Sequence, residues 1–169
     1  MTFKTPFALD DLVRFILRAR EQSYVGGAEK IKNPQRPGFK EFAPFREGLF
    51  EYVDSYIGYY YAPGQEIVRF KDVPVWNMAY NGGIAPEFHG DLEFARRINA
   101  FLRKALLNVK QERPFRGPSL LVQDDFVYVD RSRGDITHFN GTERIFYRDD
   151  NVFKRVFKQD YIGGLIAPK

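Results

Sequence analysis

Hydrophobic residues recur at helical spacing in two stretches of the chain, and each stretch predicts a helix with one buried face. The apolar face near the N-terminus is formed by Leu12, Phe15, Ile16 and Ala19. The second, broader face is formed by Phe94, Ala95, Ile98, Phe101, Leu102, Ala105 and Leu106. Asp10 and Asp11 suit the cap and first turn of the first helix, and helical spacing in the second stretch begins at Asp91.

After each predicted helix, the spacing changes to short segments bounded by turn residues, which is typical of strands. The segments after the first helix are 40–45, 49–54, 58–62, 65–71 and 74–80. Those after the second are 119–123, 125–131, 135–139, 142–148 and 152–158. The pattern predicts an α+β fold in which two helices pack on a mostly antiparallel sheet.

The two blocks of strands share an ordered set of residues. The run Phe50-Glu51-Tyr52-Val53-Asp54 matches Phe126-Val127-Tyr128-Val129-Asp130, Gly64-x-Glu66 matches Gly141-x-Glu143, and Tyr80-Asn81-Gly82-Gly83 matches Tyr161-Ile162-Gly163-Gly164. We therefore expect one domain, 1–169, in which a helix-plus-β-meander unit occurs twice, at about 8–84 and 90–166. A cleft is expected at the seam between the two units.

Composition narrows the function classes. The 169 residues include no cysteine, so disulfides, Cys-based metal sites and thiol nucleophiles are excluded. Neither a signal peptide nor an apolar run long enough to span a bilayer is visible, and a cytoplasmic protein without membrane contact is expected. The net charge of +4 is small, and acids interleave with bases, so nucleic acid is an improbable partner.

The paired positions of the repeat place four carboxylates at equivalent sites: Asp54, Asp130, Glu66 and Glu143. One interpretation brings them together at the pseudo-axis, for acid–base chemistry or a divalent ion. The favoured interpretation is structural: both aspartates end strands and accept hydrogen bonds in turns, while both glutamates lie on solvated faces.

Established catalytic and metal-binding motifs are absent from the sequence. His89 and His138 lie far apart, without a partner at ligand spacing, so no metal is expected. No serine lies in a Gly-x-Ser-x-Gly elbow. We therefore assign no catalytic residue and no cofactor.

Two groups of residues are candidates for ligand contacts. The basic loop that begins at Tyr24 could hold an anion between glycine amides and cations, although a solvated connector is the favoured reading. The aromatic group comprises Tyr59, Tyr60, Tyr61, Trp76 and Tyr80. If 58–62 is a strand, Tyr60 points away from Tyr59 and Tyr61. Trp76 is expected to pack under a helix. The ligand-binding candidates are Tyr24, Lys30, Arg36, Asp54, Tyr60, Glu66, Trp76 and Tyr80.

An ordered pattern over most of the chain resembles a bacterial domain of unknown function. It is formed by Tyr24-x-Gly26-Gly27, Arg36-Pro37-Gly38-x-Lys40-Glu41, Tyr52-x-Asp54-Ser55-Tyr56-x-Gly58, Gly64-Gln65-Glu66, Pro74-Val75-Trp76-x-Met78-x-Tyr80 and Arg116-Gly117-Pro118. Members of that family occur alone or behind a Cro/repressor-type helix-turn-helix. The resemblance implies a ligand-sensing or interaction role, and any DNA-binding reader is expected to be a separate protein.

The leading functional hypothesis is a small ligand-binding or interaction module with a regulatory or sensory role, whose partner is a small molecule or a protein. The alternative is an enzyme that uses carboxylates at the seam, such as Asp54 and Glu66, with an arginine or tyrosine as electrophile. A second alternative is a weak nucleic-acid binder that stacks bases on exposed aromatic residues. The oligomeric state is left open.

Overall fold

The computed structural model describes residues 4–167, so the predicted domain 1–169 extends slightly beyond the described part at both ends. It contains two α-helices and nine strands. In chain order the elements are α1 (Leu9–Gln22), β1 (Lys40–Glu41), β2 (Phe45–Glu47), β3 (Phe50–Tyr56), β4 (Gly64–Phe70), β5 (Val73–Ile84), the 3-10 helix η1 (Pro86–Phe88), α2 (Leu92–Leu107), β6 (Leu120–Gln123), β7 (Phe126–Asp135), β8 (His138–Asp149) and β9 (Val152–Leu165).

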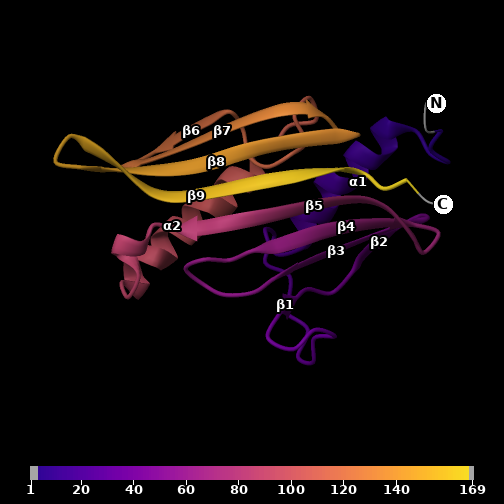
Figure 1. Ribbon diagram of the computed structural model, residues 1–169, viewed down its shortest axis with the longest axis horizontal. Coiled ribbons are helices and arrows are strands. Elements are labelled where there is room, and N and C mark those ends of the chain that lie inside the picture. The colour runs from indigo at the N-terminus through magenta and orange to yellow at the C-terminus, as the bar shows by residue number, and fades with distance from the viewer. Residues whose placement is uncertain (1–3, 168–169) are drawn as a thin grey trace.

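All nine strands belong to one antiparallel sheet, ordered β1-β3-β4-β5-β9-β8-β7-β6, with β2 also paired to β3. Both helices lie on the same side of this sheet (Figure 1). At its centre β5 pairs with β9, from Trp76 opposite Leu165 to Ile84 opposite Phe157. The predicted α+β class, with two helices on an antiparallel sheet, is confirmed.

The two predicted helices form because each can bury an apolar face against the sheet. All four predicted apolar positions of α1 are buried, and of the seven in α2 only Phe94 is partly exposed. Asp91 caps α2, since its carboxylate accepts a hydrogen bond of 2.9 Å from the Phe94 amide. In α1, Asp10 and Asp11 occupy the first turn as predicted, but the N-cap residue is Ala8, which offers no side-chain cap.

The core has two parts, one under each helix. Under α1, Phe15 and Trp76 are fully enclosed, and Trp76 stacks on Phe139 with ring centroids 5.8 Å apart. Under α2, Phe101 stacks on Phe126 at 5.2 Å. Each part includes strand residues from the same sheet face, so the helices and the sheet form two layers.

Two predicted strands are wrong. The segment 58–62 holds no strand, only an isolated bridge between Tyr61 and Gly83. The chain turns there at Gly58, whose φ is +90° and where a Cβ would lie 2.1 Å from the Tyr61 carbonyl oxygen. The segment 135–139 contains the end of β7, a tight turn at Ile136 and Thr137 and the start of β8, and the Asp135 carboxylate accepts a 2.8 Å hydrogen bond from the Thr137 amide in this turn.

Two three-stranded meanders, β3-β4-β5 and β7-β8-β9, meet edge to edge at the β5–β9 pair. In the first, Asp54 lies opposite Glu66, and in the second Asp130 lies opposite Glu143. The registers therefore agree with the predicted correspondence, while the duplication itself stays a prediction. No helix in the described part of the chain is both long and apolar enough to cross a membrane.

Candidate functional site

A cavity of about 360 Å³ lies at the seam between the two meanders. Its walls come from the loop after α1, from strands β3, β4, β5 and β9, and from one side of α2. Six of the eight predicted ligand-binding residues line it: Tyr24, Lys30, Asp54, Tyr60, Glu66 and Tyr80. A mostly apolar concave site with a few polar groups is the usual form of a small-molecule site.

The other two candidates, Trp76 and Arg36, make contacts that stabilise the fold rather than face the cavity. Trp76 is completely buried under α1, as expected, and its indole nitrogen donates a 3.1 Å hydrogen bond to the Ile136 carbonyl oxygen. Arg36 holds the basic loop in place: it forms an ion pair of 3.0 Å with Glu41 and donates to the Ser55 hydroxyl. Neither side chain lines the cavity.

The four paired carboxylates do not lie where the favoured interpretation put them. The exposed fractions of Asp54, Glu66, Asp130 and Glu143 are 4%, 3%, 2% and 0%. All four lie inside strands, since β3 continues to Tyr56 and β7 to Asp135. The expectation of turn aspartates and solvated glutamates is therefore wrong. The helices cover this face of the sheet, and a strand pattern alone does not show which face they choose.

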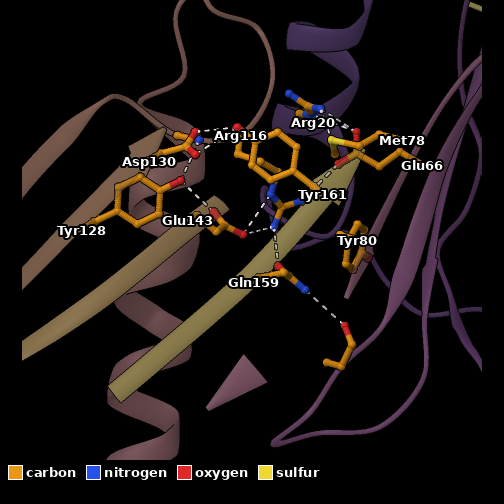
Figure 2. Close-up of polar contacts among 12 residues, drawn as sticks. Arg20, Glu66, Met78, Tyr80, Arg116, Tyr128, Asp130, Glu143, Gln159 and Tyr161 are labelled. Carbon is orange, nitrogen blue, oxygen red and sulfur yellow. Dashed lines mark hydrogen bonds and ion pairs between the residues drawn. The ribbon is translucent and has the colours of Figure 1, made fainter. Parts of the chain in front are cut away.

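Two buried arginines neutralise the two glutamates (Figure 2). Arg20 of α1 donates from Nε and Nη2 to Glu66 Oε2 at 2.9 and 2.8 Å. Arg116, in the loop between α2 and β6, donates from Nε and Nη2 to Glu143 Oε1 at 3.0 and 2.9 Å. Arg116 Nη1 also lies 3.5 Å from Glu66 Oε1. Arg116 therefore connects the two halves electrostatically beneath the cavity.

Tyrosine hydroxyls reach the two aspartates across a strand. Tyr80 donates to Asp54 Oδ1 at 3.0 Å, and Tyr161 donates to Asp130 Oδ1 at 2.9 Å. Each tyrosine ring passes over the glycine that faces it in register, Gly64 or Gly141. A Cβ at Gly64 would lie 2.4 Å from the Tyr80 hydroxyl oxygen, so a glycine is required for this crossing.

The two aspartates differ in their remaining neighbours. Arg113 Nη2 lies 2.7 Å from Asp130 Oδ2. Asp54 has no such cation, and among residues 4–167 no side chain or amide donates a hydrogen bond to its Oδ2. Burial, with repulsion from Glu66 as the second cause, raises the pKa of Asp54 to about 7. Burial also raises the pKa of Asp130, to about 6, while Arg113 acts against that rise.

Tyrosines form much of the cavity wall. Tyr24 packs against Tyr56 with ring centroids 5.3 Å apart, and Tyr59 packs against Tyr60 at 5.1 Å, both edge to face. Tyr59 and Tyr60 line the cavity together. The expectation that they point to opposite sides is therefore wrong, because it assumed a strand at 58–62.

Three cations lie on the cavity wall at solvent-exposed positions: Lys30, Arg96 and Arg103. None of them forms an ion pair within the described chain. Arg103 acts on the tyrosine wall, since it opposes the rise that burial causes in the pKa of Tyr24. In residues 4–167 no group of three or more His, Asp or Glu side chains is placed to hold a metal ion.

A family profile for a domain of unknown function, DUF5680, matches residues 54–166, which is more than half of the chain. The chain belongs to DUF5680. Neither the curated proteins nor the solved structures contain a match to it. The resemblance to a domain of unknown function is thus confirmed at the level of the family.

The DUF5680 match begins at Asp54 and includes Glu66, Tyr80 and the α2 side of the cavity. The α1 helix and the loop through Lys30 lie before it, although they supply one cavity wall and Arg20. Arg20, Arg116 and the α2 arginines Arg96 and Arg103 are site residues that were not predicted from the sequence. Arg96 and Arg103 are seven positions apart, hence on one helix face, and this spacing is a signal that could have been used.

Proposed function

We propose that this DUF5680 protein binds a small molecule in the cavity at the seam. The observation that carries the proposal is Asp54, a buried carboxyl group that lines the cavity: one oxygen accepts a hydrogen bond from Tyr80, and the other has no donor within residues 4–167. Burying a polar group without a partner costs free energy, and a ligand that supplies a donor removes this cost.

A regulatory or sensory role is the form of binding that we favour. It is supported by the resemblance to domains that occur behind repressor-type helix-turn-helix units. It is also supported by the composition of the walls, because a ligand in the cavity contacts α2, the loop after α1 and strands of both meanders. Such a ligand stabilises the contacts between these elements, and a partner protein could respond to that change.

Thermal-shift screening of the purified protein against a metabolite library tests the proposal. A ligand that binds only the folded state raises the melting temperature, and the rise grows with the ratio of the ligand concentration to its Kd. For any hit, the variant Asp54→Asn should weaken binding, whereas Asp160→Asn, which removes an exposed carboxylate on β9, should not. A library without a hit, or hits that are insensitive to Asp54→Asn, would contradict this assignment of the site.

A second candidate, an enzyme, is favoured by the position of Asp54, a buried carboxyl group that lines the cavity and whose pKa is raised by burial to about 7. A carboxyl group that titrates near neutral pH can both accept and donate a proton. Glu66 is ion-paired to Arg20 and would position rather than react. Mass spectrometry of a recovered ligand separates the two candidates. A chemically changed ligand with wild type, and an unchanged ligand with Asp54→Asn, indicates catalysis.

A further inference from the structure

We infer that the ligand is a planar molecule with an N–H donor group at one end and an anionic group at the other. This inference rests on the proposed binding function and adds the chemical class of the ligand. Three features of the cavity each specify one part of the ligand: the carboxyl group of Asp54, the tyrosines of the walls and three exposed cations that form no ion pair among residues 4–167.

The donor end follows from the comparison of the two aspartates. Asp54 and Asp130 occupy corresponding registers, opposite Glu66 and Glu143, and each accepts a tyrosine hydroxyl. Beside Asp130 the protein supplies the Arg113 guanidinium, 2.7 Å from Oδ2. Beside Asp54 it supplies a cavity. A ligand group that carries N–H donors like those of a guanidinium, such as an amidine, a guanidine or a ring amine, can pair with Asp54 as Arg113 pairs with Asp130.

The charges of the cavity lining indicate that the other end of the ligand is anionic, because the cations outnumber the carboxylates. The lining carries two carboxyl groups, and Glu66 is already neutralised by Arg20 and lies near Arg116. Lys30, Arg96 and Arg103 have no carboxylate partner within the described residues. Three cations that line one cavity and have no ion pair among residues 4–167 attract an anion, and arginine in particular suits carboxylate or phosphate.

The tyrosines of the cavity walls indicate that the middle part of the ligand is planar. Tyr24, Tyr56, Tyr59 and Tyr60 offer ring faces and edges, which favour a flat, polarisable ligand over an aliphatic one. The volume of about 360 Å³ is in the range of small-molecule sites. A nucleoside monophosphate and a substituted benzoate both have this chemistry.

The inference is tested with small probes that carry one end or both, measured by isothermal titration calorimetry at pH 7.5. In the first arm, 4-guanidinobenzoate carries both ends, benzamidine only the donor and benzoate only the anion. In the second arm, AMP carries both ends and adenosine lacks the anion. We expect at least one two-ended probe to bind roughly ten-fold or more tightly than its one-ended relatives, which corresponds to one charge-assisted hydrogen bond.

Variants assign each end of the probe to its residues. Asp54→Asn should weaken the two-ended probe and benzamidine roughly ten-fold and leave benzoate unchanged. Arg96→Gln with Arg103→Gln should weaken the two-ended probe and benzoate and leave benzamidine unchanged. The matched control is Arg97→Gln, because Arg97 lies on the same helix over the rings of Phe126 and Tyr147 and outside the cavity.

Equal binding of one-ended and two-ended probes, or selectivity that survives both sets of variants, would overturn the inference. So would a library ligand without these two ends whose binding depends on Asp54; in that case the proposed binding function stands and only the ligand class is wrong. If no probe and no library compound binds the folded protein, both proposals fail.

Discussion

At the scale of single residues, Arg113 is the side chain that separates the surroundings of the two buried aspartates. It approaches Asp130 to 2.7 Å, whereas among residues 4–167 the Asp54 carboxyl group accepts a side-chain hydrogen bond only from the Tyr80 hydroxyl. Burial raises the pKa of both carboxyl groups, and Arg113 opposes this rise at Asp130, so the pKa is about 7 for Asp54 and about 6 for Asp130. The protein therefore retains a group whose charge changes near neutral pH at the surface of its cavity.

The raised pKa of Asp54 makes the stability of the free protein depend on pH. Because the folded state holds this proton more tightly than the unfolded state, the stabilisation is complete below the ordinary aspartate pKa and is lost as the pH rises to about 7. Between pH 5 and 8 we expect wild type to lose on the order of 3 kcal/mol relative to Asp54→Asn. Urea unfolding at four pH values measures both slopes. Equal slopes would contradict the prediction.

The buried pair of Arg20 and Glu66 should be costly to break and cheap to replace. Arg20→Met leaves Glu66 buried without its partner and should lower the free energy of unfolding by about 3–5 kcal/mol. Arg20→Met combined with Glu66→Met should recover most of this loss. The control is Arg18→Met on the same helix, which removes an exposed ion pair with Glu47 of β2 and should change stability by less than about 1 kcal/mol. A double variant as unstable as the single one would refute the account.

The sequence could predict those site residues that a pattern along the chain marks, but not those that reach the site only through contacts between distant segments. Asp54, Glu66 and Tyr80 were found because the repeat pattern marks them along the chain. Arg20 and Arg116 were missed because each meets its carboxylate only through tertiary packing; Arg20 and Glu66 are 46 positions apart in the chain. The burial of the carboxylates was missed for the same reason: the covered face of a sheet is decided by the helices, not by strand alternation.

At the scale of elements, long amphipathic segments were the most predictable part of the fold. Both helices follow their apolar periodicity, and β3, β4 and β5 lie close to the predicted 49–54, 65–71 and 74–80. The errors occurred at 58–62 and 135–139, where aromatic or apolar residues coincide with tight turns. Propensity alone cannot separate a tyrosine in a strand from one in a loop that lines a cavity.

The crossing of Tyr80 over Gly64 links two strands to the site and can be tested at this scale. Gly64→Ala places a methyl group 2.4 Å from the Tyr80 hydroxyl oxygen and 2.5 Å from the Ser55 carbonyl oxygen, so Tyr80 must move off Asp54. We expect a loss of about 1–3 kcal/mol in the free energy of unfolding and weaker ligand binding. Gln65→Ala, the adjacent position on the same strand, should cost less than about 1 kcal/mol. Chemical denaturation checks both. A fully stable Gly64→Ala protein would contradict the crossing.

At the scale of the whole molecule, the two meanders are joined by the β5–β9 ladder and by Arg116, which contacts Glu143 in one half and lies 3.5 Å from Glu66 of the other. The cavity uses walls from both halves, so neither half alone could form the site. We expect the folded state to be most stable when both halves fold together, because separating them exposes the edges of the central strands and leaves buried charges unpaired.

We therefore predict that the halves unfold in one cooperative transition. Trp76, the single tryptophan, lies in the first half and reports its packing by fluorescence, whereas hydrogen exchange in β7 and β8 reports the second half. The two probes should give the same free energy of unfolding, as expected for a two-state domain. Arg116→Met should lower both values together, because it leaves Glu143 without its cation. Different values for the two halves in wild type would show that the chain folds as two separate units, which the continuous sheet and the shared cavity argue against.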